Sequence, residues 1–518
     1  MADNTANNKR IAKNSLYMSI RMVFVLLISL YATRAVLKAL GVEDYGVYNV
    51  VAGFVSMFAF LNTSMASATQ RFFNFELGKN GESGANVVYN TAFVIHLLLA
   101  IIVVIVTIPV GLWYLHHEMV LPEGRMFAAE CIFYFSVAAL FVTIITVPYT
   151  AAVMAHERMN FYAIVGIIDA ILKLVVVLIL PYLSGDHLIW YGTLYLATTI
   201  LDLIFYLSYS KNHFPEIHFV QSSPRHLFGP MLSFSGWGLL GSFSFILRTQ
   251  GTNLLLNAFF GPAVNAAKGV AEQINGALNT FIGNIITPAR PQVIQSYSQD
   301  NFDRAWHLTY SVSKLVTIIF FMLALPISLE INFILHLWLG NNVPEHTNWF
   351  VILILLAGLF GSITTPISII IHASGKVRFY HLVSSISNLF SLPLAYVLLT
   401  FSPIPEYAFV AIALTMLSNY IAALVSAKRH GRLAFGEYSR KVLLPIGKVI
   451  ALASPICLSI AFCMSEGWLR LLCVVPISIF TIILVAFFFA LNKREKELVQ
   501  SVFNKLLKRF CSLCHNSN

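Results

Sequence analysis

Long runs of apolar residues, interrupted by short polar segments, dominate the 518-residue chain. About twenty consecutive apolar residues are enough to cross the hydrocarbon core of a bilayer as a helix. Fourteen such runs occur, and each predicts a membrane-spanning helix. Their approximate bounds are residues 15–39, 46–67, 87–114, 127–154, 161–183, 188–209, 229–257, 263–287, 307–328, 348–372, 378–401, 406–427, 442–464 and 468–491.

Composition places the chain in the same class as the apolar pattern. Hydrophobic residues make up 58% of the chain and charged residues only 11%, which is outside the range of soluble domains. We therefore expect an all-α polytopic membrane protein. The net charge of +10 does not indicate nucleic-acid binding, because a basic excess in a membrane protein usually lies in its cytoplasmic loops.

The distribution of lysine and arginine predicts the orientation. If the N-terminus is cytoplasmic, 23 of the 33 cations fall in cytoplasmic segments and only Arg125 and Arg470 fall on the opposite side. An even number of spans then places both termini in the cytoplasm. The polar segment 1–14 precedes an apolar run too long for a signal-peptide core, so we expect the first helix to remain in the mature chain.

Two similar hairpins indicate an internal repeat. The first span is followed by LGVEDYGVYNVVAGF, opening on Gly41, and the seventh by FGPAVNAAKGVA, opening on Gly261. Arg71 lies 30 residues after the first glycine and Arg290 lies 29 after the second, each at the inner end of the next helix. Parallel repeats of this kind place a substrate site between two moving helix bundles in transporters.

The repeat predicts two six-helix lobes around a central cavity, with two further helices at the C-terminal end. The tail after Asn492 is basic and amphipathic, which predicts an interfacial helix on the anionic inner leaflet. The expected organisation is an N-lobe at 1–210, a cytoplasmic linker at 211–228, a C-lobe at 229–428, two extra helices at 442–491 and the tail at 492–518.

Eight cations lie inside the predicted spans, where a charge costs about 2.5–3.5 kcal/mol at the bilayer centre. Lys448 and Arg21 are near a cytoplasmic end, where a long side chain can snorkel to the headgroups. Arg34 and Lys38 are near the outer end, so they either snorkel outward or face a cavity. Arg248 lies deep in the seventh span, which makes it the strongest candidate for a cavity cation. The candidate cavity cations, expected to bind substrate, are Arg21, Arg34, Lys38, Arg248 and Lys268.

Carboxylates inside the spans are candidates for ion coupling. Lys173 follows Asp169 by four residues, and Glu272 follows Lys268 by four, so each pair can share a helix face and neutralise itself. Asp202 has no partner at helical spacing. It is either a proton or cation site or the partner of a neighbouring helix, Lys173 included. The coupling candidates are Asp202, Glu272, Asp169 and Lys173, and the candidate gates are Arg71 and Arg290.

The chain lacks the motifs of an enzyme. IHASGKV has the Gly-Lys of a phosphate-binding loop without its other residues, and LHHEMV lacks the second histidine of a zinc helix. The six cysteines fall mostly in apolar runs and give no disulfide framework. We therefore expect no catalytic residues, no metal and no organic cofactor, and a driving force from a proton or sodium gradient, a partner or the substrate's own gradient.

Several segments carry a resemblance to a known family. These are LGVEDYGVYNVVAGF, ATQRFF, QGTNLLLNAFFGPAVNAAKGVAEQINGAL, PARPQVIQSYSQDN and ILHLWLG. Together with the fourteen spans, they resemble the polysaccharide (Wzx-type) flippases of the multidrug/oligosaccharidyl-lipid/polysaccharide (MOP) exporter superfamily. The resemblance implies transport of undecaprenyl-diphosphate-linked oligosaccharide across the bacterial inner membrane for O-antigen of lipopolysaccharide, capsule or exopolysaccharide. Expected partners are this lipid-linked glycan, membrane lipids and the polysaccharide polymerase machinery.

Other functions stay open at this point. A cation-coupled multidrug exporter of the same superfamily would be expected to carry a carboxylate in its first helix, where this chain has three cations and no acid. A lipid II flippase and a membrane scaffold without a transport cycle are further alternatives. Arginine suits a diphosphate because its planar fork of donors matches oxygen-rich anions. In the expected cycle the headgroup enters from the cytoplasm past Arg248, Lys268 and Arg21 and leaves past Arg34 and Lys38.

Overall fold

The structure is a computed structural model that describes residues 2–156, 158–220, 227–286, 289–374, 376–492 and 495–497. Helices account for nearly all of these residues, and none of them forms a strand. The prediction of an all-α membrane protein is confirmed. The predicted amphipathic tail lies outside the described residues beyond 497.

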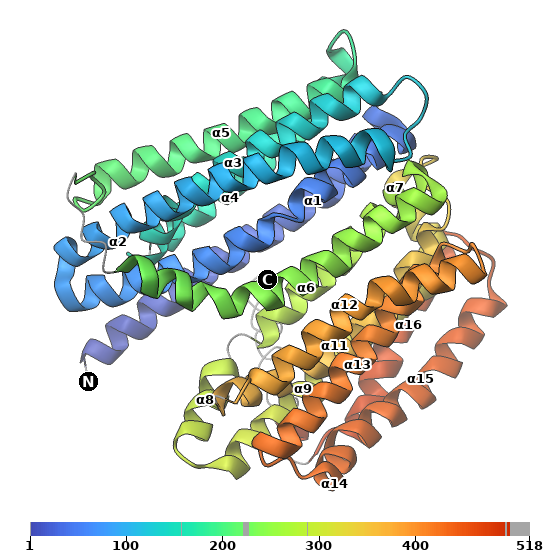
Figure 1. The fold of residues 1–518 in the computed structure, drawn as a ribbon. Helices are drawn as coiled ribbons and strands as arrows, with labels where there is room; N and C mark the ends of the chain where they lie inside the picture. Colours follow the sequence, from blue (N-terminus) through green and yellow to red (C-terminus); the bar gives the residue numbers. More distant parts are fainter. Residues whose placement is uncertain are drawn as a thin grey trace, which may run out of the picture. The chain divides into compact units, whose positions relative to one another are not determined.

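Long helices follow one another with short connections (Figure 1). Two π-helical turns, at Ser439–Leu443 and Ala486–Ala490, adjoin the helices α15 and α16. The α-helices are α1 (Ala2–Ser56), α2 (Ala59–His117), α3 (Met126–Ala155), α4 (Met159–Ile179), α5 (His187–His213), α6 (Phe228–Phe260), α7 (Pro262–Ile286), α8 (Ala289–Ser298), α9 (Phe302–Leu329), α10 (Ile331–Leu339), α11 (Thr347–Ala373), α12 (Arg378–Phe401), α13 (Glu406–His430), α14 (Phe435–Tyr438), α15 (Leu444–Cys463) and α16 (Trp468–Val485).

Each of the fourteen predicted spans falls on helix. Eleven helices in the described part of the chain are long and apolar enough to cross a membrane. Three of the predicted spans, 46–67, 229–257 and 263–287, do not appear as membrane-crossing helices of their own among these eleven. The first of them is divided between α1 and α2, and the other two coincide with α6 and α7, which carry the polar side chains described below.

The two repeated glycines have the same backbone conformation. Gly41 breaks α1 with φ 81° and ψ 175°, and Gly261 separates α6 from α7 with φ 78° and ψ −176°. A positive φ strains any residue with a Cβ atom, so glycine is required at both turns. The structure confirms that each hairpin opens on a glycine. The division into an N-lobe and a C-lobe stays a prediction.

The helices group into two compact units. The first comprises residues 1–273, 336–350 and 384–415. In it α3 packs between α2 and α5, α4 packs on α1, and α6 packs on α2 (Figure 1). The buried side chains of this unit are mainly apolar and form clusters between neighbouring helices, whereas Ile105 and Phe127 are more than 60% exposed. Such exposed apolar side chains are expected where a helix faces lipid.

The second unit comprises residues 274–335, 351–383 and 416–518. Here α9 packs against α8, α15 and α16. The carboxylate of Glu330 at the end of α9 is buried and accepts a 2.7 Å hydrogen bond from Arg470 Nε. This contact ties α9 to the start of α16.

The described part of the predicted linker packs on α2 instead of extending from it. Asn86 Nδ2 donates to the carbonyl oxygens of Glu216 and His218, and Asn90 Nδ2 also donates to that of His218. The carboxylate of Glu216 is buried and lies 2.5 Å from His156 Nε2. These contacts satisfy backbone groups that would otherwise be buried without partners.

An arginine bridges two aspartates at the start of α3. Arg125 contacts Asp44 in the first hairpin and Asp186 before α5, at 2.6 Å for its Nη1 to Asp186 Oδ2. Asp186 also caps α5, because its Oδ1 accepts from the backbone N–H groups of Leu188 and Ile189. Arg125 therefore joins the start of α3 to the first hairpin and to the start of α5, which Asp186 caps.

We predict that Asp186→Asn lowers stability at neutral pH and not in acid. Burial raises the pKa of Asp186, but the hydrogen bonds from Arg125 and from the Ile189 backbone, with the arginine charge, outweigh it, and the pKa lies below its ordinary 3.8. A lowered folded pKa means that the stabilisation is complete above pH 3.8 and is lost as the pH falls through the folded value.

Thermal unfolding of the purified protein between pH 7 and pH 3 measures this. The difference between wild type and Asp186→Asn should be largest at pH 7 and should close below pH 3.8. Glu123→Gln, at an exposed position in the loop before α3, removes the same charge without breaking an ion pair between described residues and should have no effect. A difference that is independent of pH would contradict this account.

Candidate functional site

A polar pocket of about 220 Å³ lies within the first unit, between α1, α6 and α7. The second half of α1, residues 42–56, supplies Asn49 and Ser56. The other walls are Gln250 and Asn253 from α6, with Lys268 and Glu272 from α7. All three elements belong to predicted membrane spans, so the pocket places hydrogen-bonding groups at membrane depth.

Glycines make this close approach of helices possible. A Cβ atom on Gly53 of α1 would lie 2.7 Å from both Gln250 Oε1 and Asn253 Nδ2. A Cβ atom on Gly269 of α7 would lie 3.0 Å from Asn49 Oδ1. Small residues at such positions let polar groups of one helix reach the backbone of the next. The pocket therefore depends on glycine as much as on its polar side chains.

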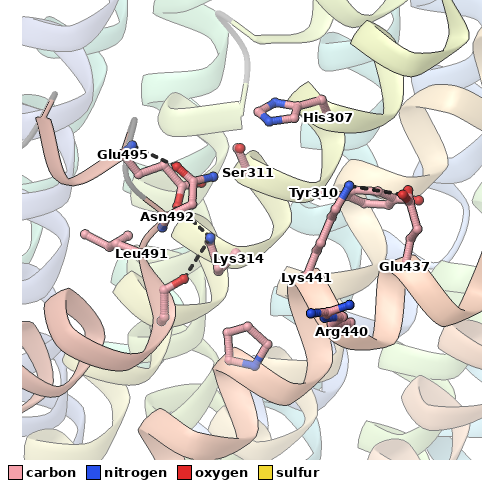
Figure 2. Close-up of a pocket in the computed structure, with 12 residues that line it drawn as sticks. His307, Tyr310, Ser311, Lys314, Glu437, Arg440, Lys441, Leu491, Asn492 and Glu495 are labelled. Carbon is pink, nitrogen blue, oxygen red and sulfur yellow. Dashed lines mark hydrogen bonds and ion pairs between the residues drawn. The ribbon is translucent and has the colours of Figure 1, made fainter.

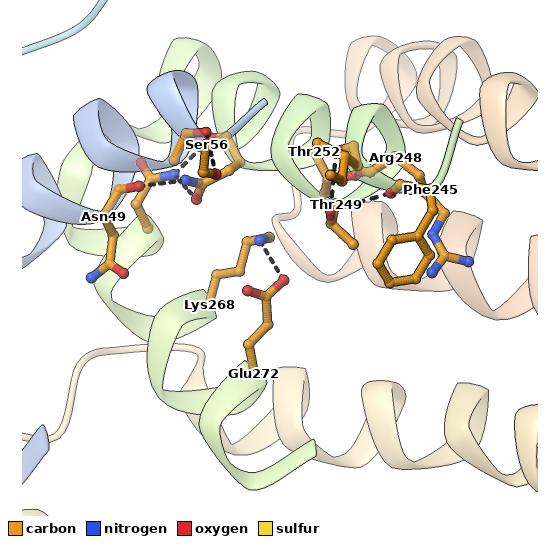
Figure 3. A network of polar contacts seen from close by, with 12 residues as sticks. Asn49, Ser56, Phe245, Arg248, Thr249, Thr252, Lys268 and Glu272 are labelled. Atoms are coloured by element: carbon orange, nitrogen blue, oxygen red, sulfur yellow. Dashed lines mark hydrogen bonds and ion pairs between the residues drawn. The ribbon is translucent and has the colours of Figure 1, made fainter. Parts of the chain in front are cut away.

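Lys268 and Glu272 form the charged part of the pocket (Figure 3). Lys268 Nζ lies 2.5 Å from Glu272 Oε1, so the predicted pairing along one helix face is confirmed. The lysine side chain is 2% exposed, whereas the glutamate side chain is 39% exposed. The ammonium group is thus held inside the protein by a carboxylate that still reaches solvent-accessible space.

Amide side chains form the uncharged part. Asn253 Nδ2 donates to the Asn49 carbonyl oxygen at 2.9 Å, and Asn265 Nδ2 donates to the Asn253 carbonyl oxygen at 2.6 Å. Ser56 Oγ donates to the Gly53 carbonyl oxygen. Amides both donate and accept hydrogen bonds, as sugar hydroxyl groups do. The lining can therefore bond to a polar, uncharged ligand as well as to an anion.

Close contacts connect the segments at the hairpin end of α6 and α7. Asn257 of α6 bonds in both directions to the Val120 backbone, with its Oδ1 accepting from the N–H and its Nδ2 donating to the carbonyl, each at 3.0 Å. Gly46, in the first hairpin, packs so closely on the second that a Cβ atom would clash with the Pro262 carbonyl. The contact between Gly46 and Pro262 joins the two repeated hairpins directly.

Arg248 is buried but does not line the described pocket. Its Nη1 donates to Asn388 Oδ1 of α12 at 3.2 Å, and its guanidinium lies 5.1 Å from the centre of the Phe245 ring. In Figure 3 the Arg248 guanidinium lies apart from the Lys268 ammonium, with the Phe245 ring beside it. Glu272 is nevertheless close enough to Arg248 to interact with its charge. Arg248 could therefore influence a ligand in the pocket through its charge, but it does not contact the pocket.

The cations of the first span occupy other places. Arg34 and Lys38 are exposed, and Arg34 Nη1 donates to the Leu337 carbonyl oxygen of α10 at 3.3 Å. Trp338, next in α10, donates to the Leu30 carbonyl oxygen at 2.6 Å. The motif ILHLWLG therefore contacts the first span.

Arg21 packs among the helices of the first unit. Its guanidinium lies 4.7 Å from the centre of the Tyr162 ring, and its Nε lies against Gly166 of α4. It does not line the described pocket either. Of the five predicted cavity cations, only Lys268 does.

A second charged cluster joins α4 and α5. Lys173 Nζ lies 2.8 Å from Asp169 Oδ2, which confirms the other predicted pair, and 4.8 Å from the centre of the Tyr195 ring. Asp202 lies within hydrogen-bonding reach of Asp169 and close to Lys173. Asp202 Oδ1 is buried and has no hydrogen-bond partner among the described residues, so both alternatives for Asp202 stay predictions.

The two candidate gates are both exposed. Arg71 lies on α2 in the first unit, and Arg290 lies at the start of α8 in the second. Arg290 is close enough to His372 to interact with it electrostatically. Their predicted gating role stays a prediction.

Sequence reasoning missed the uncharged residues of the pocket because it followed charge alone. Asn49, Gly53 and Ser56 recur at helical spacing, and Gln250 and Asn253 are three residues apart. Both sets lie in spans that are otherwise apolar, and each set shares one helix face. A polar stripe of this kind is the signal that could have found them.

No protein-family model and no curated protein matches the sequence. Solved structures do match. A structure titled lipid II flippase MurJ, inward closed conformation, has a TM-score of 0.71 and 14% identity, and the match covers 92% of this chain and 98% of that one. The chain has the fold of the MOP transporters.

Two further MOP structures support this statement. An inward-facing multidrug resistance MATE family transporter matches with a TM-score of 0.59 and 16% identity over 81% of this chain and 99% of that one. A MOP superfamily transporter from Pyrococcus furiosus, described by a reversed polarity of its binding pocket, matches with a TM-score of 0.57 and 15% identity over 81% and 96%. The neighbours of this MOP fold are transporters and flippases, not enzymes.

We predict that replacing Glu272 lowers the stability of the protein more than replacing Lys268 does. Glu272→Gln leaves an ammonium group uncompensated at 2% exposure, and breaking a buried pair in this way costs about 3–5 kcal/mol at most. Lys268→Met leaves a carboxylate that can reach water, so its cost should be smaller.

Thermal unfolding of the two purified variants checks this order. The pair Lys441–Glu437 has the same spacing but is about half exposed on both sides, so Glu437→Gln is the matched control and should change little. Equal losses for Glu272→Gln and Lys268→Met would contradict the asymmetry.

Proposed function

We propose that the protein moves an undecaprenyl-diphosphate-linked oligosaccharide from the inner to the outer leaflet of the bacterial inner membrane. The cargo would serve the assembly of a surface polysaccharide such as O-antigen, capsule or exopolysaccharide. The MOP fold supports a flippase or transporter, and the choice of cargo rests on the chemistry of the pocket.

The observation that carries this choice is the charge balance around the pocket. Lys268 and Arg248 both interact with the carboxylate of Glu272, so two buried positive charges lie near one carboxylate of the described pocket. In a medium of low dielectric a buried cation attracts an anion. The neighbouring amides of Asn49, Gln250 and Asn253 provide donors and acceptors for phosphate and sugar oxygens.

A lipophilic cation is a poorer match to this site. A multidrug exporter that binds cations would be expected to present an excess of carboxylate or aromatic surface. The described pocket has one carboxylate, which is already paired, and one aromatic residue, Tyr48. The first span also has cations where such an exporter would be expected to carry an acid.

Size indicates that transport requires motion. Pockets for drug-sized molecules are about 300–1,000 Å³, and the described pocket of about 220 Å³ is smaller than an oligosaccharide. The contacts of Asn257 with Val120 and of Gly46 with Pro262 lie at the hairpin end, which the charge distribution predicts to be external. Opening these contacts would release the headgroup outward by alternating access.

The cluster of Asp169, Lys173 and Asp202 is the proposed coupling site. The carboxylates of Asp169 and Asp202 lie close to each other and to the Lys173 ammonium group. Tyr206 is close enough to both Asp202 and Arg21 to interact with their charges. Uptake of a proton or a sodium ion there would change the local balance by one charge. In an apolar setting such a change alters helix packing, which is how an ion gradient could drive the cycle.

Lipid II flipping is the second candidate function. The structural likeness to a protein titled lipid II flippase favours a lipid-linked glycan as cargo, and the chemistry of the pocket is equally suited to that substrate. The two functions differ in which glycan lipid accumulates when the protein is lost.

Depletion of the protein in its own host tests the proposal. We expect the lipid-linked oligosaccharide of surface polysaccharide to accumulate in the inner leaflet while drug susceptibility is unchanged. Lys268→Gln should fail to restore export at normal protein level, because it removes a buried positive charge from the pocket wall. Asp202→Asn should reduce export and its dependence on the ion gradient.

Three outcomes would overturn the proposal. Accumulation of lipid II with cell lysis would favour the second candidate. Drug hypersensitivity with normal surface polysaccharide would favour a multidrug exporter. Full export with the Lys268→Gln variant would remove this residue from the site.

A further inference from the structure

A larger pocket, of about 450 Å³, lies wholly within the second unit (Figure 2). Its walls come from the start of α9, from the turn joining α14 to α15, and from the chain that follows α16. The volume is within the usual range for pockets that bind small molecules. The charge distribution of the sequence predicts that this end of these helices is cytoplasmic.

Two π-helical turns border the pocket. Ser439–Leu443 carries Arg440 and Lys441, and Ala486–Ala490 ends at the carbonyl that accepts a 2.9 Å hydrogen bond from Lys314 Nζ. A π-helical turn inserts a residue into the helical ladder, changes the direction of its side chains and is frequently found at functional sites. Here both turns direct polar groups toward the same space.

The floor of the pocket is a buried ammonium group. Lys314 is 5% exposed, and its Nζ lies 2.6 Å from Glu495 Oε2 and 2.9 Å from the Ala490 carbonyl oxygen. Glu495 and Asn492 cap each other reciprocally, since the carboxylate accepts from the Asn492 N–H and Asn492 Oδ1 accepts from the Glu495 N–H. Lys314 therefore fixes the chain that leaves α16.

The rim of the pocket carries the excess charge. Lys441 pairs with Glu437 at 3.2 Å, but both are about half exposed and such a pair is weak. Arg440 is exposed and makes no hydrogen bond or ion pair with any other residue that the structure describes. Three cations therefore face two carboxylates, which leaves one positive charge and a guanidinium group available for an anion.

Apolar side chains adjoin the charged rim. Leu444 follows the first π-helical turn and is 55% exposed, and Phe488 and Phe489 in the second turn are more than half exposed. A free phosphate would have no use for this surface, whereas the acyl chains of a lipid would cover it. Basic pockets at the cytoplasmic ends of membrane helices are a known mode of binding for anionic headgroups.

We propose that this pocket binds the phosphate headgroup of an anionic phospholipid of the cytoplasmic leaflet, with Arg440 and Lys441 as its ligands. The phosphate accepts hydrogen bonds from the guanidinium fork. Its acyl chains lie along Leu444 and Phe488. The bound lipid would stabilise the junction between α9, α15 and the end of α16.

The test uses the full-length purified protein in nanodiscs of phosphatidylglycerol or phosphatidylcholine. Wild type should unfold at higher temperature in phosphatidylglycerol, and native mass spectrometry should show a retained phosphatidylglycerol molecule. Arg440→Gln combined with Lys441→Gln should weaken retention about tenfold, the effect of losing one charge-assisted hydrogen bond of about 1.5 kcal/mol.

The matched control removes two exposed cations outside the pocket, by Arg378→Gln and Lys428→Gln. It should retain phosphatidylglycerol as wild type does. Equal losses in the two double variants would show nonspecific charge attraction and overturn the site. Equal stabilisation by inorganic phosphate or glycerol phosphate, without lipid, would also overturn the proposal because the acyl chains would then contribute nothing.

Discussion

A charge buried in an apolar medium must be compensated by a partner or by water, and this constraint organises the polar groups of the chain. Lys268, Lys173 and Lys314 each lie inside a predicted span, and each contacts a carboxylate within 2.8 Å. The cost of an uncompensated ammonium group would be several kcal/mol, so these pairs are conditions for folding in a membrane. The proposed functions use the two places where several cations gather near few carboxylates, around Glu272 and around Arg440.

Glycine is the second requirement, because it brings polar groups close enough to compensate one another. Gly41 and Gly261 provide matching turns, and Gly46 lets the two hairpins touch. Gly53 and Gly269 allow the amides of α1 and α6 to reach neighbouring backbone. The predicted internal repeat is therefore visible in the backbone, because the two glycine turns have nearly the same φ and ψ angles although few of the surrounding residues are the same.

The fold could be predicted from the sequence because apolar length and loop charge are local properties. Each of the fourteen spans falls on helix, and the pairs at four-residue spacing were confirmed, since neighbours on one helix do not depend on tertiary structure. Contacts between helices could not be predicted. Neither the bond from Arg248 to Asn388 nor the proximity of Asp202 to Asp169 follows from spacing along the chain. The amides of the pocket were missed because an uncharged polar residue is common in packed membrane helices and carries little signal alone.

The central claim is that the polar groups of α1, α6 and α7 line a hydrated site that opens to the cytoplasm. Ser56 tests it most directly, because Ser56→Cys nearly preserves shape and places a thiol on the pocket wall. In a background without the six native cysteines, a membrane-impermeant thiol reagent should label this cysteine in inside-out vesicles and not in intact cells. A cysteine at the lipid-facing Ile105 should stay unlabelled in both. Absence of labelling at position 56 from either side would contradict the claim.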